Sequence, residues 1–265
     1  MPQRCSNAQF ILNYQGQKYN ETEEIRKIDF SKYDTIVECF GGSFGFSRFQ
    51  FYEKGIYRNY IIYDNDKELI DFYNHIRGKV IDNEIDEYLE VYNDYCDIIV
   101  KQFTMDNKNK TLSQDALKYV ESEIDDVFMR YWLIKNIKCS FILRVYPKRK
   151  INFEIFKQAI FIHSDICDID FSIYDKDKTL FYLDPPYLFE ECNYYKENDS
   201  NFFERILELF EKDFNTIFIH TNTFVINHLF KKYKYDTYNK TYRNKNKKTK
   251  HIVFYNDKSK SVKDN

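Results

Sequence analysis

The sequence is poor in turn-forming residues and has no paired cysteines. It contains only 6 glycines and 4 prolines in 265 residues. The 6 cysteines are dispersed, with no C-x-x-C pair and no histidine at the spacing of metal ligands. We therefore expect reduced thiols in an intracellular protein, with no metal site.

Long apolar runs are also missing. No stretch approaches the roughly 20 apolar residues of a membrane-spanning helix, and the opening MPQRCSNAQF lacks the apolar core of a signal peptide. We expect a protein of the cytoplasm or nucleoid with no membrane partner, and an origin in a virus or phage acting in its host is left open. Because the net charge is only −2, affinity for nucleic acid has to come from local basic patches.

What the chain does contain is an alternation of strand and helix patterns. Its composition, 43% hydrophobic and 31% charged, is that of a globular protein. Such alternation predicts an α/β fold with a parallel sheet and helices on both faces, and the short final connection predicts an antiparallel hairpin. The expected strands are 35–40, one ending at Asp64, 159–165, 179–183, 216–220, 235–242 and 251–255. The expected helices are 81–97, 113–138, 200–213 and 223–232, with one more after each of the first two strands.

A glycine-rich turn follows the first strand. Three of the 6 glycines, Gly41, Gly42 and Gly45, lie here between a strand and a helix, where backbone N–H groups can approach a ligand. The second strand ends at Asp64, which is the place of a ribose hydroxyl partner in doubly wound folds. The alternative is that Asp66 caps the next helix and Asp64 is solvated.

A rigid corner ends the strand 179–183. The apolar run stops at Asp184-Pro185-Pro186-Tyr187, and neither proline can continue a strand ladder. The Asp184 carboxylate and the Pro185 carbonyl can accept both N–H bonds of an exocyclic amine and free its lone pair, while Tyr187 stacks on the base. The alternative is a strand-ending turn with an exposed acid.

Two basic stretches are candidates for contact with phosphate. The first runs from Lys135 to Lys150 and includes Phe141 and Tyr146, and basic side chains mixed with aromatic ones can hold a nucleic acid. The second, 231–250, has nine Lys or Arg against one acid. For any single residue of the first stretch a solvated surface is an equally good interpretation.

Taken together, these motifs resemble the Dam-type (α-class) adenine-N6 DNA methyltransferases, in the family's order and over almost the whole chain. Y-Q-G-Q-K (14–18) resembles its N-terminal motif, E-C-F-G-G-S (38–43) its glycine-rich motif, and Y-D-N-D (63–66) its second acidic motif. H-S-D (163–165) fits its third motif, D-P-P-Y (184–187) its catalytic motif, and the segment 242–255 its terminal basic hairpin.

The resemblance implies a Rossmann-like S-adenosylmethionine-dependent methyltransferase fold with a mostly helical target-recognition insertion. Residues 1–77 and 159–256 would form the catalytic domain, 78–158 the DNA-binding region and 257–265 a flexible tail. Catalytic residues would be Asp184, Pro185, Pro186 and Tyr187. The residues that bind S-adenosylmethionine would be Tyr14, Lys18, Phe40, Gly42, Asp64, Asp165 and Asp184. Residues that contact double-stranded DNA would be Arg144, Lys148, Arg149, Lys150, Arg243, Lys245 and Lys247.

Two departures from the family pattern stand out. Phe44 lies where the second glycine is expected, and Tyr14 replaces a tryptophan. A methyltransferase for adenosine in RNA, for a cytosine amine or for a glutamine side chain would use the same corner chemistry. A nucleic-acid-binding relative that has lost its cofactor is a further alternative. A cognate restriction endonuclease and the choice between monomer and homodimer are left open.

Overall fold

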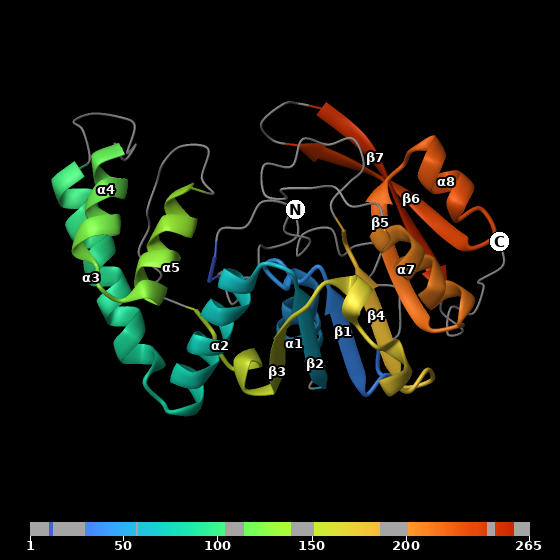
Figure 1. The fold of residues 1–265 in the computed structure, drawn as a ribbon, viewed down its shortest axis with the longest axis horizontal. Helices are drawn as coiled ribbons and strands as arrows, with labels where there is room; N and C mark the ends of the chain where they lie inside the picture. The colour runs from blue at the N-terminus through green and yellow to red at the C-terminus, as the bar shows by residue number, and fades with distance from the viewer. Residues whose placement is uncertain are drawn as a thin grey trace. The chain divides into compact units, whose positions relative to one another are not determined.

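A computed structural model of the chain describes residues 11–12, 30–56, 58–103, 114–138, 151–185, 201–242 and 247–256 (Figure 1). It divides into two compact units. One comprises residues 1–17 and 66–159 and is helical, and the other comprises 18–65 and 160–265 and contains the sheet.

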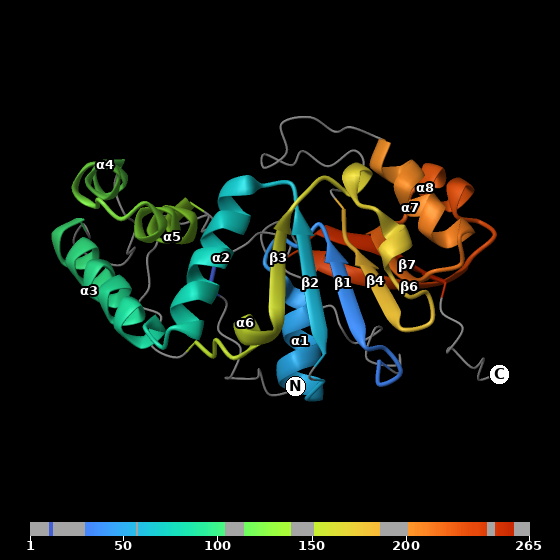
Figure 2. The same cartoon turned by 60° about the horizontal axis from the view of Figure 1, so that its bottom comes forward.

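The sheet has seven strands in the order β3-β2-β1-β4-β5-β7-β6 (Figure 2). They are β1 (Thr35–Cys39), β2 (Asn59–Asp64), β3 (Ala159–His163), β4 (Thr179–Leu183), β5 (Asn215–Thr221), β6 (Lys234–Tyr242) and β7 (Lys247–Asn256). Strand β1 is parallel to both β2 and β4, and β4 is parallel to β5. Strand β7 is antiparallel to β5 and β6. The predicted α/β fold, with a mixed sheet and an antiparallel C-terminal hairpin, is confirmed.

The strand order reverses direction between β1 and β4, and we call this place the switch point of the sheet. The chain runs outward from β1 to β2 on one side and from β4 to β5 on the other. In open α/β sheets the connections diverge at such a point and leave a crevice at the carboxyl ends of the strands. The ends of β1 and β4 are therefore where a ligand site is expected.

Side chains of the strands alternate between two covered faces. Val37, Cys39 and Leu183 belong to a buried cluster that includes residues of α7 (Asn201–Glu211) and α8 (Phe224–Leu229). On the opposite face Tyr182 stacks on Phe46 of α1 (Gly45–Lys54), with ring centroids 3.9 Å apart. The prediction of helices on both faces is confirmed, since an all-buried strand such as β4 needs cover on each side.

Several element boundaries differ from the expected ones. Strand β3 ends at His163, before Asp165, and two short 3-10 helices follow, η2 (Ile166–Asp168) and η3 (Phe171–Ile173). Helix α8 ends at Leu229, three residues before the predicted end. Strand β4 matches its predicted range, because the prolines fix where it stops.

The helical unit contains α2 (Lys67–Ile81), α3 (Ile85–Phe103), α4 (Gln114–Glu123), α5 (Val127–Lys138) and α6 (Ile155–Gln158). The single helix predicted over 113–138 is wrong: α4 ends at Glu123 and α5 begins at Val127. Asp126 causes the break, because its Oδ1 accepts hydrogen bonds from Phe128 N and Met129 N, both at 2.9 Å, and so caps α5. Helix α2 contacts α3, α5 and α6, so it groups with this unit, although the sequence placed residues up to 77 with the sheet.

A buried polar cluster ties the start of the chain to α5. Trp132 Nε1 donates to the Ile11 carbonyl at 2.7 Å, and Asn136 Nδ2 donates to the same oxygen at 3.2 Å. Asn136 Nδ2 also donates to Tyr92 Oη at 3.1 Å, and the Tyr92 ring stacks on Trp132 with centroids 4.0 Å apart. With Ile11 and Leu12 each 1% exposed, residues 11–12 are part of the core of the helical unit.

Candidate active site

The glycine-rich turn lies against the end of β2. Gly41 N–H donates to the Tyr63 carbonyl at 2.8 Å. A Cβ at position 41 would lie 2.4 Å from Ile62 Cγ2 and 3.2 Å from the Tyr63 oxygen, so no larger residue fits without displacement. Glycine at this position is what allows the turn to reach the neighbouring strand.

Three residues of the turn have left-handed backbone conformations. The φ angles of Phe40, Gly42 and Phe44 are 60°, 48° and 39°. For a residue with a side chain this conformation costs about 1–2 kcal/mol. At Phe44 the cost is offset by a fully buried ring that packs edge-on against Phe161, with centroids 5.3 Å apart. The turn therefore forms with phenylalanine where the resembled family has its second glycine, and α1 begins at the next residue.

The carboxylate of Asp64 closes the turn. Its Oδ2 accepts the Gly42 N–H at 2.8 Å, and its side chain is nearly buried, with the residue 5% exposed. The alternative that Asp64 is solvated is wrong, while Asp66 does cap α2, since its Oδ1 accepts from Leu69 N at 3.1 Å. Two residues predicted to share a cofactor, Gly42 and Asp64, are thus in direct contact.

The acidic corner of β4 lies level with this turn. Cys39 of β1 is paired with Tyr63 on one side and with Leu183 on the other. The next residues therefore lie at the carboxyl ends of three adjacent strands: Asp64 is the last residue of β2, and Phe40 and Asp184 directly follow β1 and β4. At the usual strand spacing the Cα atoms of Asp64 and Asp184 are roughly 10 Å apart.

The corner itself is partly sheltered from solvent. Asp184 is half-buried, and Pro185, the next residue, is buried. An exposed acid at a surface turn, the alternative interpretation of the sequence, does not describe this arrangement. The strand before it is buried along its whole length, so the position of the corner is set by the sheet.

A second acid, Glu38, lies beside the corner on the α1 face. Its Oε2 accepts hydrogen bonds from Ser47 N at 3.0 Å and from Ser47 Oγ at 2.6 Å, within the first turn of α1. Burial raises the pKa of Glu38 to about 7 against the lowering effect of bonds from Ser47 and Phe46, and the negative charge of Asp184 adds to the increase. The switch point therefore holds two neighbouring carboxyl groups, of which Glu38 retains its proton to higher pH than usual.

Phe40 lies at the edge of the same turn. Its ring is half-buried and meets Phe202, the second residue of α7, edge-on at a centroid distance of 5.5 Å. It also packs against the buried cluster on the α7 face. Its backbone is therefore at the switch point, and its side chain extends over the α7 side of the sheet.

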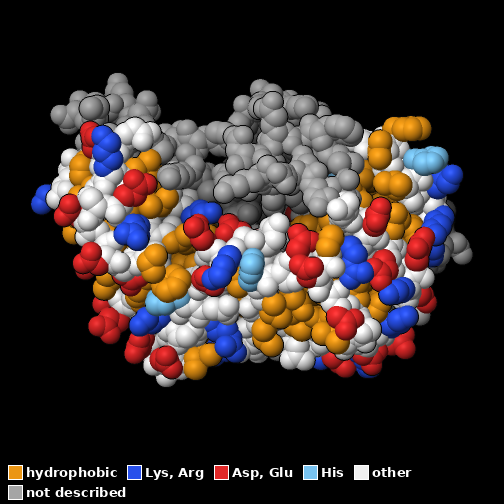
Figure 3. Space-filling model, in the orientation of Figure 1, with side chains coloured by type: hydrophobic (Ala, Val, Ile, Leu, Met, Phe, Trp, Pro, Cys, Tyr) orange, Lys and Arg blue, Asp and Glu red, His pale blue; other side chains and the backbone are white. Residues whose placement is uncertain are grey.

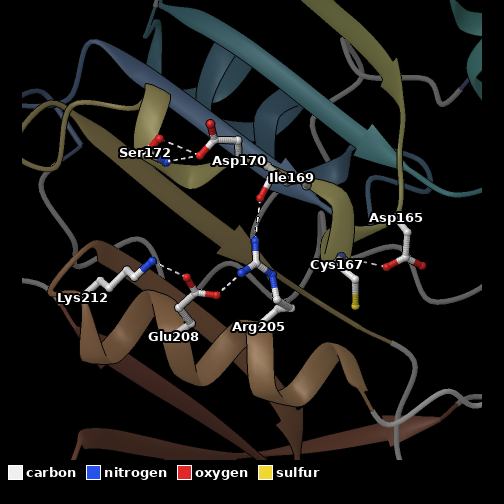
Figure 4. A network of polar contacts seen from close by, with 8 residues as sticks. All are labelled: Asp165, Cys167, Ile169, Asp170, Ser172, Arg205, Glu208 and Lys212. Carbon is white, nitrogen blue, oxygen red and sulfur yellow. Dashed lines mark hydrogen bonds and ion pairs between the residues drawn. The ribbon is translucent and has the colours of Figure 1, made fainter.

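Asp165 is placed close to β2 but has a local role in the fold. Ser164 N donates to the Asp64 carbonyl at 3.0 Å, which brings the segment after β3 beside the end of β2. The exposed Asp165 side chain accepts the Cys167 N–H at 2.8 Å and so begins η2 (Figure 4). Its role toward a cofactor stays a prediction.

An arginine on α7 holds that helix to the segment after β3 (Figure 4). Arg205 Nη2 donates to the Ile169 carbonyl at 2.6 Å, and its guanidinium lies 4.6 Å from the centre of the Phe171 ring. Glu208 accepts from both Arg205 and Lys212, and the bond from Lys212 is the main reason that the pKa of Glu208 is lowered. These contacts fix the start of α7, and with it Phe202, relative to the segment that contains Asp165.

The remaining predicted site residues are outside the described part of the chain. These residues are Tyr14, Lys18, Arg144, Lys148, Arg149, Lys150, Pro186, Tyr187, Arg243 and Lys245. Lys247 is described only in part: its backbone is the first residue of β7, paired with Tyr242, and its side chain is not described.

Two residues of the site, Glu38 and Ser47, were missed as site residues in the sequence analysis. The signal for Glu38 was present: a lone acid inside the otherwise apolar strand sequence TIVEC. A buried carboxyl group needs a partner, and a serine nine residues later, in the first turn of the next helix, is well placed to supply one.

Within the described ranges, no group of three or more His, Cys, Asp and Glu side chains is arranged to hold a metal ion. Over the same ranges, no helix has the length and apolar character required to cross a membrane. No protein-family model matches the sequence, and no curated protein matches it significantly.

Proposed function

We propose that the protein is a site-specific DNA adenine-N6 methyltransferase that uses S-adenosylmethionine. The observation that carries the proposal is the position of Asp184. It directly follows the central strand β4 at the point where the strand order reverses, at the same edge of the sheet as Asp64 and the glycine-rich turn. A carboxylate at that point is within reach of a ligand held by the turn.

The described residues fit an adenosyl cofactor. The left-handed turn has no side chain at Gly42, and the buried Asp64, which accepts the Gly42 N–H, lies at the end of β2, the usual place of a ribose partner. Phe40, Gly42, Asp64 and Asp165 would hold the cofactor, together with Tyr14 and Lys18. When bound, S-adenosylmethionine supplies an electrophilic methyl group on a sulfonium.

Residues of this chain would prepare the amine. The Asp184 carboxylate and the Pro185 carbonyl accept its two N–H bonds, which draws the nitrogen toward tetrahedral geometry and exposes its lone pair. Tyr187 stacks on the base, and Pro186 keeps the corner rigid. Because the pKa of Glu38 is raised to about 7, this group is uncharged at lower pH and then adds no second negative charge next to the acceptor. After transfer the nitrogen loses a proton to solvent, so no strong base is required.

A base inside a duplex is out of reach of such a corner, so the adenine has to be extruded. The cost of unstacking, a few kcal/mol, is offset by stacking in the pocket and by contacts to phosphate. Arg144, Lys148, Arg149 and Lys150, with Arg243, Lys245 and Lys247, would supply the phosphate contacts. This partner, double-stranded DNA, is the one that the family resemblance implies.

The test is transfer of labelled methyl groups to DNA, followed by digestion to nucleosides. We expect N6-methyladenine with the wild-type protein and none with Asp184→Ala, whose fold is checked by circular dichroism and whose DNA affinity should be nearly unchanged. Asp170→Ala is the control, because this carboxylate caps η3 through the Ser172 N–H and belongs to no proposed site, so most of the rate should remain. Full activity of Asp184→Ala would refute the proposed role.

Two alternative functions can be distinguished by further measurements. A methyltransferase for adenosine in RNA would be inhibited by RNA more strongly than by DNA in a competition experiment. A relative that no longer binds its cofactor, which the unusual Phe44 motivates, would show no heat of binding with S-adenosylmethionine in calorimetry.

A further inference from the structure

The first turn of α8 exposes an aromatic ring in an apolar patch. We call Phe224, Val225, His228 and Leu229 the α8 patch. Phe224 is 83% exposed, Val225 41% and Leu229 38%, and His228 is exposed as well. The Phe224 and His228 rings stack with centroids 6.0 Å apart and planes at 24°. Figure 3 shows hydrophobic side chains beside a histidine and several lysine or arginine side chains at this end of the molecule.

The patch lies at the same edge of the sheet as the proposed active site. Strands β4 and β5 are parallel, and their pairing of Leu183 with Phe218 places Asp184 level with Ile219. Strand β5 ends at Thr221, and only two residues separate it from Phe224. Since parallel strands have their carboxyl ends at one edge, the exposed ring begins α8 near the height of the acidic corner.

A basic strand borders the patch. Asn222 N donates to the Lys250 carbonyl at 2.8 Å, which fixes the start of α8 to β7, and the Lys250 side chain is exposed. From 222 to 256 the sequence has nine Lys or Arg and one acid, Asp236. The exposed cation Lys250 therefore lies on the residue that is bonded to the segment just before Phe224, within a stretch of sequence that is rich in Lys and Arg.

The charges near the α8 patch indicate which kind of ligand binds there. Cores of protein–protein interfaces are depleted in lysine, whereas an exposed lysine, Lys250, lies next to the start of this patch. An exposed aromatic ring with a lysine nearby is instead an arrangement that binds nucleic acid strands: the ring stacks on a base and the cation neutralises a phosphate. The position at the catalytic edge favours the strand that enters the active site.

We propose that the α8 patch holds the DNA strand next to the extruded adenine, with the Phe224 ring stacked on an unpaired base and Lys250 in contact with a neighbouring phosphate. This inference rests on the proposed function and deepens it. It adds a DNA contact on α8, outside both the helical unit and the tip of the β6–β7 hairpin. Phe224 acts here as a binding residue and takes no part in the methyl transfer.

The test compares DNA affinity of the full-length protein with that of Phe224→Ala, Phe224→Trp and Lys250→Gln. Fluorescence anisotropy with labelled single-stranded and duplex DNA gives the dissociation constants at several salt concentrations. Loss of one stacked base corresponds to roughly 5-fold to 150-fold weaker binding for Phe224→Ala, and Phe224→Trp should restore it. Lys250→Gln should reduce the slope of log affinity against log salt by about 1.

Ile173→Ala is the matched control, since Ile173 is 69% exposed in the sheet unit but lies on η3. It should bind DNA like the wild type, and all variants should bind S-adenosylmethionine equally in calorimetry. Unchanged DNA affinity of Phe224→Ala would overturn the inference, as would a variant that only converts a dimer into a monomer in sedimentation, because the patch would then join two copies of the chain.

The outcomes for the two proposals differ. If the wild type methylates DNA but Phe224→Ala binds as well as the wild type, only the inference about the α8 patch fails. If Phe224→Ala weakens binding and the wild type transfers no methyl group, the patch stands and the proposed activity fails. If the wild type binds no DNA at all, both are refuted.

Discussion

Replacing Glu38 by glutamine should change how the stability of the protein depends on pH. Glu38 is buried and its pKa is raised from 4.5 to about 7. In the unfolded chain the carboxyl group loses its proton near its ordinary pKa, whereas in the folded protein it keeps the proton until about pH 7. Between these two values the folded state binds more protons, so the free energy of unfolding of the wild type decreases as pH rises.

The size of the effect follows from the two pKa values. A difference from 4.5 to about 7 corresponds to about 3 kcal/mol, fully lost above pH 7 and fully retained below pH 4.5. For a protein of this size that is a change in Tm of roughly 6–12 °C. Glu38→Gln has no proton to lose, and its amide oxygen can still accept from Ser47 N and Oγ, so its Tm should lack this component.

Thermal melts followed by circular dichroism at pH 5 and pH 8 provide the measurement. We expect the variant to match the wild type within a few degrees at pH 5 and to melt at a higher temperature at pH 8. Glu90→Gln, at an exposed position of α3, should show the same difference from the wild type at both pH values. If the difference between Glu38→Gln and the wild type is equal at pH 5 and pH 8, the buried, protonated Glu38 is refuted.

Two further predictions concern the backbone of the glycine-rich turn. Gly41→Ala should lower the unfolding free energy by about 1–3 kcal/mol in urea denaturation, because the added Cβ meets Ile62. Gly78→Ala is the control: the position is in open space on α2, so alanine should raise the unfolding free energy by about 0.5–1 kcal/mol. Equal effects of the two substitutions would contradict the close approach at Gly41. At Phe44, glycine should be less destabilising than alanine by about 1–2 kcal/mol, since the left-handed conformation favours glycine. At Phe49, inside α1, the order should reverse, and denaturation of the four variants checks both rankings.

The sheet was well predicted from the sequence because its strands carry strong local signals. Strand β4 is a fully apolar run stopped by two prolines, and its observed range equals the predicted one. The contact of Gly42 with Asp64 was not visible in the sequence as a bond, but the spacing of turn and acid placed both at one edge. A parallel sheet brings its carboxyl ends together, so the order of the motifs was enough.

The errors came from features that periodicity does not record. The apolar stripe over 113–138 continues through the break between α4 and α5, and only the capping bond of Asp126 reveals it. Glu38 was overlooked because a single acid in a strand contributes little to a hydrophobic pattern. Its acidic neighbour Asp184 is distant in the chain and comes close to it only in the folded sheet.

The anchoring of Ile11 by Trp132 and Asn136 has a consequence for chimeras that exchange the helical unit. The helical unit is assembled from two pieces of chain, so its core includes residues that precede the sheet in the sequence. A chimera that replaced only 78–158 would leave the opening segment without its indole and amide donors. A chimera that keeps this packing has to transfer Ile11 and Leu12 together with the helices that surround them.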